Sequence, residues 1–463
     1  MIRRKHITAL IVCAAVLAGC NPKLYPPQIE VPDKYIFGEG FDRDTLGIPE
    51  DWWKMFGDTI LDGLIERSFA ANRNLAAAVS RIEEARNNLK VVRAEYLPSF
   101  GFGRHVGASY AKPTKIDQSY ILEATLSWEI SLFGAMRHAK DAAKSGIMYS
   151  EWAYRGVKLS LAAEVATTYF TLLQYRRDLN IARRSSQLRR ESATLIDSMF
   201  RRGMITGLNR EQAMSLVYTA EADIPLYDRA IKQTMLSLNV LLGETPDVEE
   251  FVGTDTLLVS GYRHIDIPIG VPSDILHRRP DVMEAYYQMT QAAANVGSAR
   301  SARLPSLSLT GNGGTSSDDI TNLFSKKSWI WSAFLSFTEP IYNFGALKRR
   351  EMVAREKYKQ SVLAYEQAYL QALSDVEKAL VSISTYREQT ERYEELVQAS
   401  TNVAMMTNAL YSSGLSAYLD VIDAERTLYD SQMQFANLIA QQYINYVNLC
   451  KALGGGWDNA GEK

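Results

Sequence analysis

The chain has 463 residues, of which 22% are charged and 46% hydrophobic, a balance typical of folded rather than disordered proteins. Its formal net charge of −2 at pH 7 argues against a general nucleic-acid binder, whose affinity would require a basic surface. The length is enough for two or three ordinary domains, so the order of the predicted elements must show how the chain is divided.

The N-terminal segment is typical of an export signal. Arg3, Arg4 and Lys5 give a basic start, and the apolar stretch that follows is too short to span a bilayer securely. Small residues then lead directly into Cys20, as in a bacterial lipobox, where cleavage leaves the cysteine as a lipid-bearing N-terminus. We expect residues 1–19 to be a signal peptide and Cys20 to carry the lipid. The alternative is an ordinary secretory signal with an incidental cysteine.

The first half of the chain predicts a pair of strands followed by long helices. A lipidated extension is expected over 20–57, and a first repeat over 58–247. Apolar and polar residues alternate strictly from Leu122 to Glu129, which is the pattern of a strand with two unlike faces. The expected elements are strands over about 98–131 and long helices over about 134–202 and 208–243.

The second half repeats this order. Leu335-Ser336-Phe337 matches Leu126-Ser127-Trp128, and Phe344-Gly345-Ala346 matches Phe133-Gly134-Ala135. A linker over 248–273 joins the two halves. The second repeat is expected over 274–457, with a C-terminal tail at 458–463. Its strands are expected over about 305–341, and its long helices over about 345–413 and 419–454.

The longest predicted helix lies between Gly345 and Gly414, an interval without proline or internal glycine. Apolar residues recur there at three- and four-residue spacing from Tyr358 to Ala404, which is the pattern of a left-handed coiled coil. At about 1.5 Å of rise per residue, this helix would measure about 100 Å. Such a rod has to pack against other long helices, as in a strut, a filament or the wall of a tube.

The predicted strands have the length and the alternation of lipid-facing strands, which need about 9–11 residues to cross a bilayer. Trp128, Trp329 and Trp331 favour a membrane location over a two-faced soluble sheet, which is the alternative. Four strands are too few to close a transmembrane barrel, because such barrels begin at about eight strands. The chain is therefore expected to oligomerise, so that no strand edge faces lipid.

With these features the chain resembles the TolC-like outer-membrane factors, in their lipoprotein branch of the OprM and NodT type. The motifs that carry the resemblance, beside the lipobox, are WWKMFGD at 52–58, PSDILHRRPDV at 272–282, ARSARLPS at 299–306 and GLSAYLDVIDAE at 414–425. The resemblance implies a homotrimer, with four strands per subunit and twelve in the trimer forming an outer-membrane β-barrel. A long-helix α-barrel would continue this barrel into the periplasm. The implied partners are outer-membrane lipid, a periplasmic adaptor and an inner-membrane pump of the resistance-nodulation-division (RND) type.

The far ends of the long helices are the candidate functional site. The resemblance implies that Leu419 and Asp423 form a periplasmic gate, with Asp420 beside them. Leu419 and Asp423 are four residues apart and share one helix face. In several copies they would give an apolar ring, which can gate by dewetting, and an acidic ring, which favours cations. The alternative is that Asp420 or Asp423 only places negative charge in a first helical turn.

The same helix ends are expected to contact the adaptor, through small residues that let helical hairpins approach closely. These residues are Gly203, Thr206, Gly207, Gly414 and Ser416.

The predicted function is a passive trimeric exit duct of a tripartite efflux system, lipid-anchored in the bacterial outer membrane and extending into the periplasm. No catalytic site, cofactor or nucleic-acid partner is expected. No metal site is expected either, because the histidines have no Cys or His partner at metal-ligand spacing. The alternative is a lipid-anchored coiled-coil scaffold of the cell envelope without a pore. The paired strands favour the duct, because a scaffold does not need them.

Overall fold

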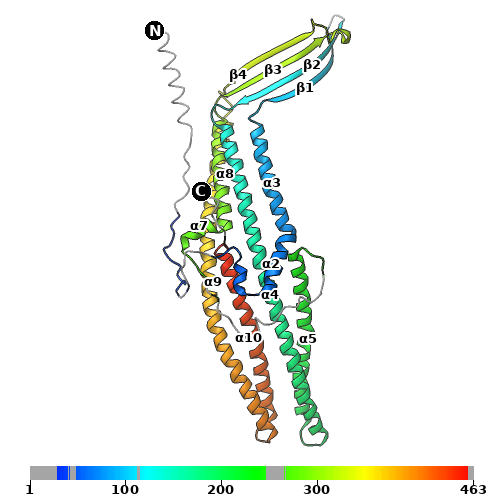
Figure 1. Cartoon of the computed structure of the whole chain (residues 1–463), viewed down its shortest axis with the longest axis vertical. Helices are drawn as coiled ribbons and strands as arrows, with labels where there is room; N and C mark the ends of the chain where they lie inside the picture. The colour runs from blue at the N-terminus through cyan, green and yellow to red at the C-terminus, as the bar shows by residue number, and fades with distance from the viewer. Residues whose placement is uncertain are drawn as a thin grey trace. The chain divides into compact units, whose positions relative to one another are not determined.

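The computed structural model describes residues 29–39, 41, 48–111, 115–246, 265 and 267–456. The predicted signal peptide, Cys20, the C-terminal tail and most of the predicted linker at 248–273 lie outside these residues. The element order of helix, two strands, long helix and shorter helix occurs twice in the described chain (Figure 1).

The longest helices in the described chain are α4 (Ala135–Arg201), α5 (Gly207–Leu242), α9 (Ala346–Ser412) and α10 (Tyr418–Ala452). α4 and α9 each contain 67 residues and no proline, which would interrupt the backbone hydrogen bonds of a helix. At about 1.5 Å per residue, each is about 100 Å long. No helix in the described part of the chain is both long enough and apolar enough to cross a membrane.

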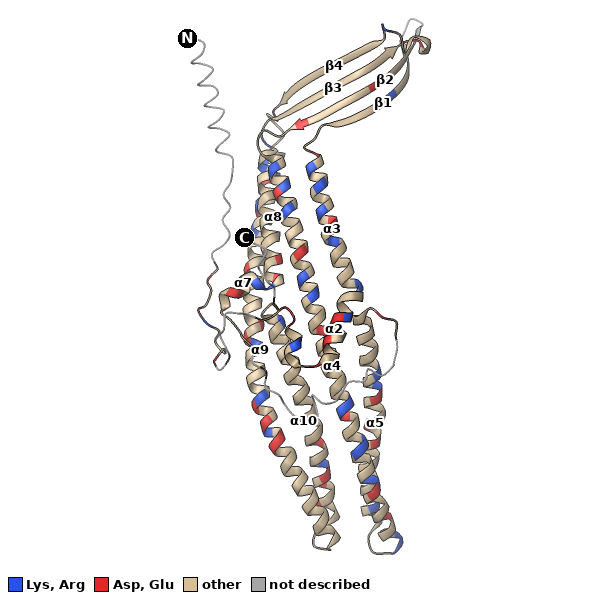
Figure 2. Ribbon diagram, in the orientation of Figure 1, with Lys and Arg blue, Asp and Glu red and all other residues tan. Residues whose placement is uncertain are grey.

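Shorter helices precede each pair of strands. They are α2 (Thr59–Ala71), α3 (Arg73–Ala94), α7 (Ile275–Arg278) and α8 (Pro280–Ser301), with 3-10 turns before them at Trp52–Phe56 and Pro272–Asp274. A further 3-10 turn, Ile320–Asn322, lies between the two strands of the second repeat. Charged residues occur along the helices, whereas the strands carry few of them (Figure 2).

The chain forms two compact units that cut across the two repeats. The first unit includes Val79–Ala153 and Met283–Ala368, and the second includes Glu30–Ala78, Tyr154–Val282 and Tyr369–Lys463. Helices α4 and α9 contribute residues to both units, so each unit contains matching pieces of both repeats. This division is expected when one repeat cannot bury its apolar face without the other.

The first unit contains an antiparallel sheet in the order β1-β2-β3-β4. Its strands are β1 (Ser99–Ala111), β2 (Lys115–Ile130), β3 (Ser306–Ser317) and β4 (Trp329–Thr338). The β2–β3 pair joins the two repeats, with Leu126 opposite Gly311 and Glu123 opposite Gly314. A Cβ atom on Gly314 would lie 2.0 Å from the carbonyl oxygen of Leu122, so only glycine permits this approach of the two strands.

The two faces of the sheet differ in chemistry, as the alternation predicts. Large apolar side chains cover one face and are mostly exposed in the single chain: Phe100, Phe102, Val106, Trp329, Trp331, Leu335 and Phe337. The opposite face carries polar contacts, in which Asn312 Nδ2 donates to Glu123 Oε2 at 3.2 Å and Ser332 Oγ donates to Asn312 Oδ1. Soluble monomers rarely expose an apolar patch of this extent, which therefore indicates a surface made for lipid or for a partner.

The core of the second unit gathers aromatic residues from distant segments of the chain. Trp52 and Phe56 are both 1% exposed, and the ring of Phe56 lies 5.2 Å from that of Phe170. The rings of Phe170 and Tyr443 stack at 5.0 Å. This cluster packs the segment before α2 against α4 and α10, so it anchors the start of the described chain to the helices.

Candidate functional site

The two long hairpins turn with the same backbone hydrogen bonds. At the end of α4, Gly203 N donates to Phe200 O at 2.9 Å and Met204 N donates to Met199 O at 3.0 Å. At the end of α9, Gly414 N donates to Tyr411 O and Leu415 N donates to Leu410 O, both at 2.9 Å. These pairs of hydrogen bonds form the Schellman motif, in which the residue after the helix adopts the left-handed backbone conformation. Both glycines have positive φ, 72° and 75°, in agreement with this requirement.

The turns present small and apolar residues to the surface. Among the predicted adaptor-contacting residues, Gly203, Thr206 and Gly414 are exposed, while Gly207 and Ser416 are partly exposed. Four large apolar side chains beside them are also exposed: Met204, Leu208, Leu415 and Leu419. Both hairpin ends are therefore open in the single chain, and each carries apolar surface.

The predicted gate residues lie in the first two turns of α10, on its exposed side. Leu419 is 54% exposed, and Asp420 and Asp423 are exposed as well. The carboxylate of Asp420 accepts hydrogen bonds from Ser416 Oγ at 2.6 Å and from Ala417 N at 3.2 Å, so it caps the start of the helix. Within the described chain, no cation or donor contacts the carboxylate of Asp423. The two aspartates thus differ, because only the carboxylate of Asp420 is held by hydrogen bonds within the described chain.

An apolar cluster packs the start of α10 against the other hairpin. The residues of this cluster come from α4, α5 and α10: Ala193, Ile196, Ala213, Leu216, Val217, Tyr418, Val421 and Ile422. Since Tyr418, Val421 and Ile422 face the cluster, Leu419 and Asp423 are left on the opposite side of the helix.

A buried arginine that the sequence did not single out lies close to this cluster. Arg189 on α4 is 4% exposed, and its guanidinium donates to Leu216 O at 3.1 Å and to Glu425 O at 3.3 Å. Its Nε lies 4.0 Å from Glu425 Oε2. The guanidinium also lies 4.8 Å from the ring centroid of Tyr429, whose hydroxyl donates to Asp223 Oδ2 at 2.7 Å. These contacts connect α4 and α5 of one hairpin to α10 of the other.

Burial shifts the ionisation of this network. Loss of solvent lowers the pKa of Arg189 and raises the pKa of Glu425, while the attraction between the two charges opposes each shift. The pKa of Tyr429 is raised by burial and by its hydrogen bond to Asp223. In the sequence, Arg189 is only a charged residue between Ser186 and Ala193. Its position becomes informative once the structure shows that both of these α4 residues are buried.

A family model described as "Outer membrane efflux protein" matches residues 64–244 and 271–455, which cover most of both predicted repeats. The chain is 30% identical to the probable efflux pump outer membrane protein TtgC of Pseudomonas putida strain KT2440, over 98% of this chain and 96% of the relative. It is 31% identical to the probable outer membrane lipoprotein SilC of Salmonella typhimurium, over 96% of this chain and 97% of the relative.

The fold is also similar to a solved channel structure. The open state of the Neisseria gonorrhoeae MtrE outer membrane channel has a TM-score of 0.82 and 27% identity, and the match covers 94% of this chain and 98% of that one. The predicted TolC-like fold and outer-membrane location are therefore confirmed. The chain belongs to the outer membrane efflux protein family, and it is a passive channel subunit of an efflux pump rather than an enzyme.

Proposed function

We propose that three copies of this chain form the outer-membrane exit duct of a tripartite efflux system. The observation that carries the proposal is the sheet, whose outer strands β1 and β4 each pair with one neighbour among the described residues. Strand edges in lipid leave peptide groups unpaired, so β4 of one copy has to pair with β1 of the next. Symmetric rings of four-stranded subunits contain eight, twelve or more strands. Three copies, with twelve strands, form the smallest such ring above the limit of about eight strands, and this ring leaves room for a solute.

The proposed partners follow from the same architecture. Outer-membrane components of efflux pumps work with an adaptor and an inner-membrane pump, and we propose an adaptor that contacts the hairpin ends and a pump of the RND type. Gly203, Thr206, Gly207, Gly414 and Ser416 are the proposed contact residues, because their small side chains let another helix approach the turns.

The proposed gate is a ring of Leu419 above or below a ring of Asp423. The exposure of Leu419 and the free carboxylate of Asp423 support it, since both side chains are available to line an opening. Asp420 contributes charge to the same level, although its carboxylate is engaged in capping the helix. A leucine ring opposes wetting and an acidic ring attracts cations, so together they favour a narrow cation-selective closed state.

The proposed anchor is a lipid on Cys20. The lipobox supports it, and the relative SilC is named an outer membrane lipoprotein. Two or more acyl chains hold a protein on a membrane stably, whereas one chain does not. Mass spectrometry of the N-terminal peptide would identify the acyl groups.

Conductance of the purified protein tests the proposal. The full chain, extracted in mild detergent, should migrate as a heat-labile trimer and give discrete ion-conducting steps in a planar lipid bilayer. A stable trimer that never conducts, or a protein that stays in solution after acyl removal, would support the envelope scaffold instead.

A further inference from the structure

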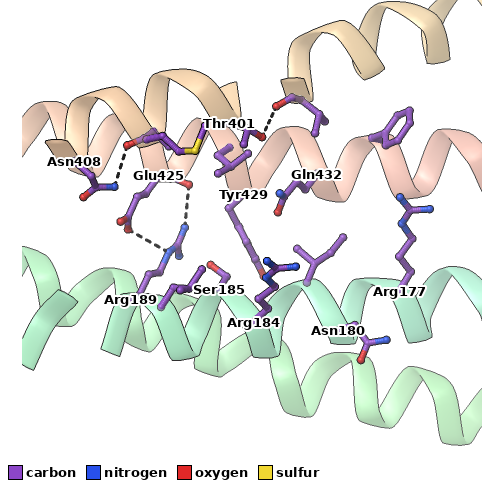
Figure 3. Close-up of a pocket in the computed structure, with 17 residues that line it drawn as sticks. Arg177, Asn180, Arg184, Ser185, Arg189, Thr401, Asn408, Glu425, Tyr429 and Gln432 are labelled. Atoms are coloured by element: carbon purple, nitrogen blue, oxygen red, sulfur yellow. Dashed lines mark hydrogen bonds and ion pairs between the residues drawn. The ribbon is translucent and has the colours of Figure 1, made fainter. Parts of the chain in front are cut away.

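A pocket of about 650 Å³ opens in the second compact unit, between α4 on one side and α9 and α10 on the other (Figure 3). Its volume lies within the range of small-molecule sites, which is about 300–1,000 Å³. Much of the wall is apolar and includes Leu188, Val397, Ala404, Met405, Leu428 and Phe435. Transfer of an apolar group of suitable size from water into the pocket is therefore favourable.

Basic residues outnumber acidic residues in the wall of the pocket. Arg177, Arg184 and Arg189 face a single acidic residue, Glu425. Arg189 and Glu425 pair with each other, with 4.0 Å between Arg189 Nε and Glu425 Oε2, so their charges compensate. The guanidinium of Arg177 lies 5.6 Å from the ring centroid of Phe435 at one end of the pocket. Among the arginines of the wall, Arg184 is the one whose charge no carboxylate of the wall compensates.

Arg184 is the residue best placed to bind an anion. Within the described ranges its side chain has no ion pair and no hydrogen bond, and it lies among the lining residues in Figure 3. Asp178, the acidic neighbour of Arg177, does not line the pocket, and burial raises its pKa to about 7. Asn180, Ser185 and Gln432 add uncharged polar groups to the wall near the arginines.

We propose that this pocket binds a small amphiphilic organic anion, with a carboxylate or sulfonate on an aromatic or aliphatic body. The acid group binds the guanidinium of Arg184 through a charge-assisted hydrogen bond, since a planar guanidinium matches a planar carboxylate. The apolar body packs against Val397, Met405 and Leu428. Because the wall comes from both long hairpins, one ligand contacts both at the same time. The inference concerns binding alone and does not depend on the proposed trimeric duct.

Photolabelling with 4-benzoylbenzoate tests this site. The probe carries one carboxylate on two aromatic rings, and its excited ketone inserts preferentially beside methionine sulfur, so Met405 is the expected point of attachment. The purified full chain in nonionic detergent is irradiated over a range of probe concentrations, and the labelled peptides are mapped by mass spectrometry. We expect saturable labelling on the α9 and α10 residues that line the pocket.

Two variants and one analogue of the probe distinguish binding in the pocket from non-specific labelling. Arg184→Gln removes an exposed charge and should raise the half-saturating concentration about tenfold, the effect of losing one charged hydrogen bond. Arg183→Gln, an exposed neighbour outside the pocket wall, should leave the half-saturating concentration unchanged. The uncharged methyl ester should label the pocket only weakly. Labelling that does not saturate, that lies mainly on the apolar sheet face, or that is equal for the two variants would overturn the proposal.

Discussion

The guanidinium of Arg189 lies over the ring of Tyr429, with 4.8 Å between the guanidinium carbon and the ring centroid. This contact joins α4 to α10, and the hydroxyl of Tyr429 extends it to Asp223 on α5. A charged side chain that is 4% exposed is stable only when its partners replace water, and here Leu216 O and Glu425 supply the acceptors. The buried cation therefore adds to the apolar cluster that holds the two hairpins together, so its loss should weaken their contact.

Arg189→Gln should loosen the start of α10. Removal of one partner from a buried charged network costs about 3 kcal/mol, because the partly buried carboxylate of Glu425 loses its cation and Leu216 O loses its donor. We expect amide hydrogen exchange in the first turns of α10 to become about a hundredfold faster. Arg190→Gln is the matched control, because Arg190 is exposed and pairs with Glu221 at the surface. Equal exchange rates in the two variants would show that the buried contacts do not hold the hairpins together.

Asp423→Asn should reduce the cation preference of the channel. The substitution keeps the size of the side chain and removes a carboxylate that no described residue neutralises. The ratio of cation to anion permeability, measured from the reversal potential in a salt gradient, should fall by about twofold or more. Glu211→Gln is the control, since it removes the same charge from an exposed residue at the other hairpin. A preference that stays the same in the Asp423 variant would remove this residue from the proposed gate.

Trp331→Lys should prevent assembly in the membrane. Trp331 is 83% exposed on the apolar face of β4, and a lysine on a lipid-facing strand costs up to about 2–4 kcal/mol, depending on its depth in the bilayer. We expect fewer heat-labile oligomers in the outer-membrane fraction on unheated gels. Ser336→Lys places the same charge on the opposite face of the same strand, where Ser308 is its cross-strand neighbour, and should assemble normally. Normal assembly of both variants would mean that the apolar face does not contact lipid.

Asp178→Asn should change how stability depends on pH. Burial raises the pKa of Asp178 from 3.8 to about 7, so the folded state keeps its proton after the unfolded state has lost it. The stability of the surrounding helix should therefore decrease as pH rises from about 4 to about 7, and stay low above that. The asparagine variant should lack this decrease and gain up to about 4 kcal/mol at pH 8.

Hydrogen exchange of α4, corrected for the intrinsic effect of pH, measures this difference. Asp228→Asn is the control, because Asp228 is an exposed residue paired with Lys232. A wild-type protein whose protection is constant from pH 5 to pH 8 would contradict the prediction.

The sequence alone determined the elements of this protein, their order and their faces. The absence of proline and glycine between Gly345 and Gly414 predicts one long helix, since helix formation depends on local backbone freedom. Alternation from Leu122 to Glu129 predicts which side chains share a sheet face, because successive side chains of a strand point in opposite directions. The motif at 414–425 named Asp423 as a gate candidate through the family resemblance, whereas the exposure of its carboxylate is known only from the structure.

Only the tertiary structure decided which helix faces meet and which charges become buried. Periodicity shows that α4 has an apolar side, but not that Arg189 on that side reaches Leu216 and Glu425. The pairing of β2 with β3 likewise depends on the close approach at Gly314. Contacts between segments far apart in the chain depend on how rods cross and strands align, and this information is not contained in the spacing of residues within one element.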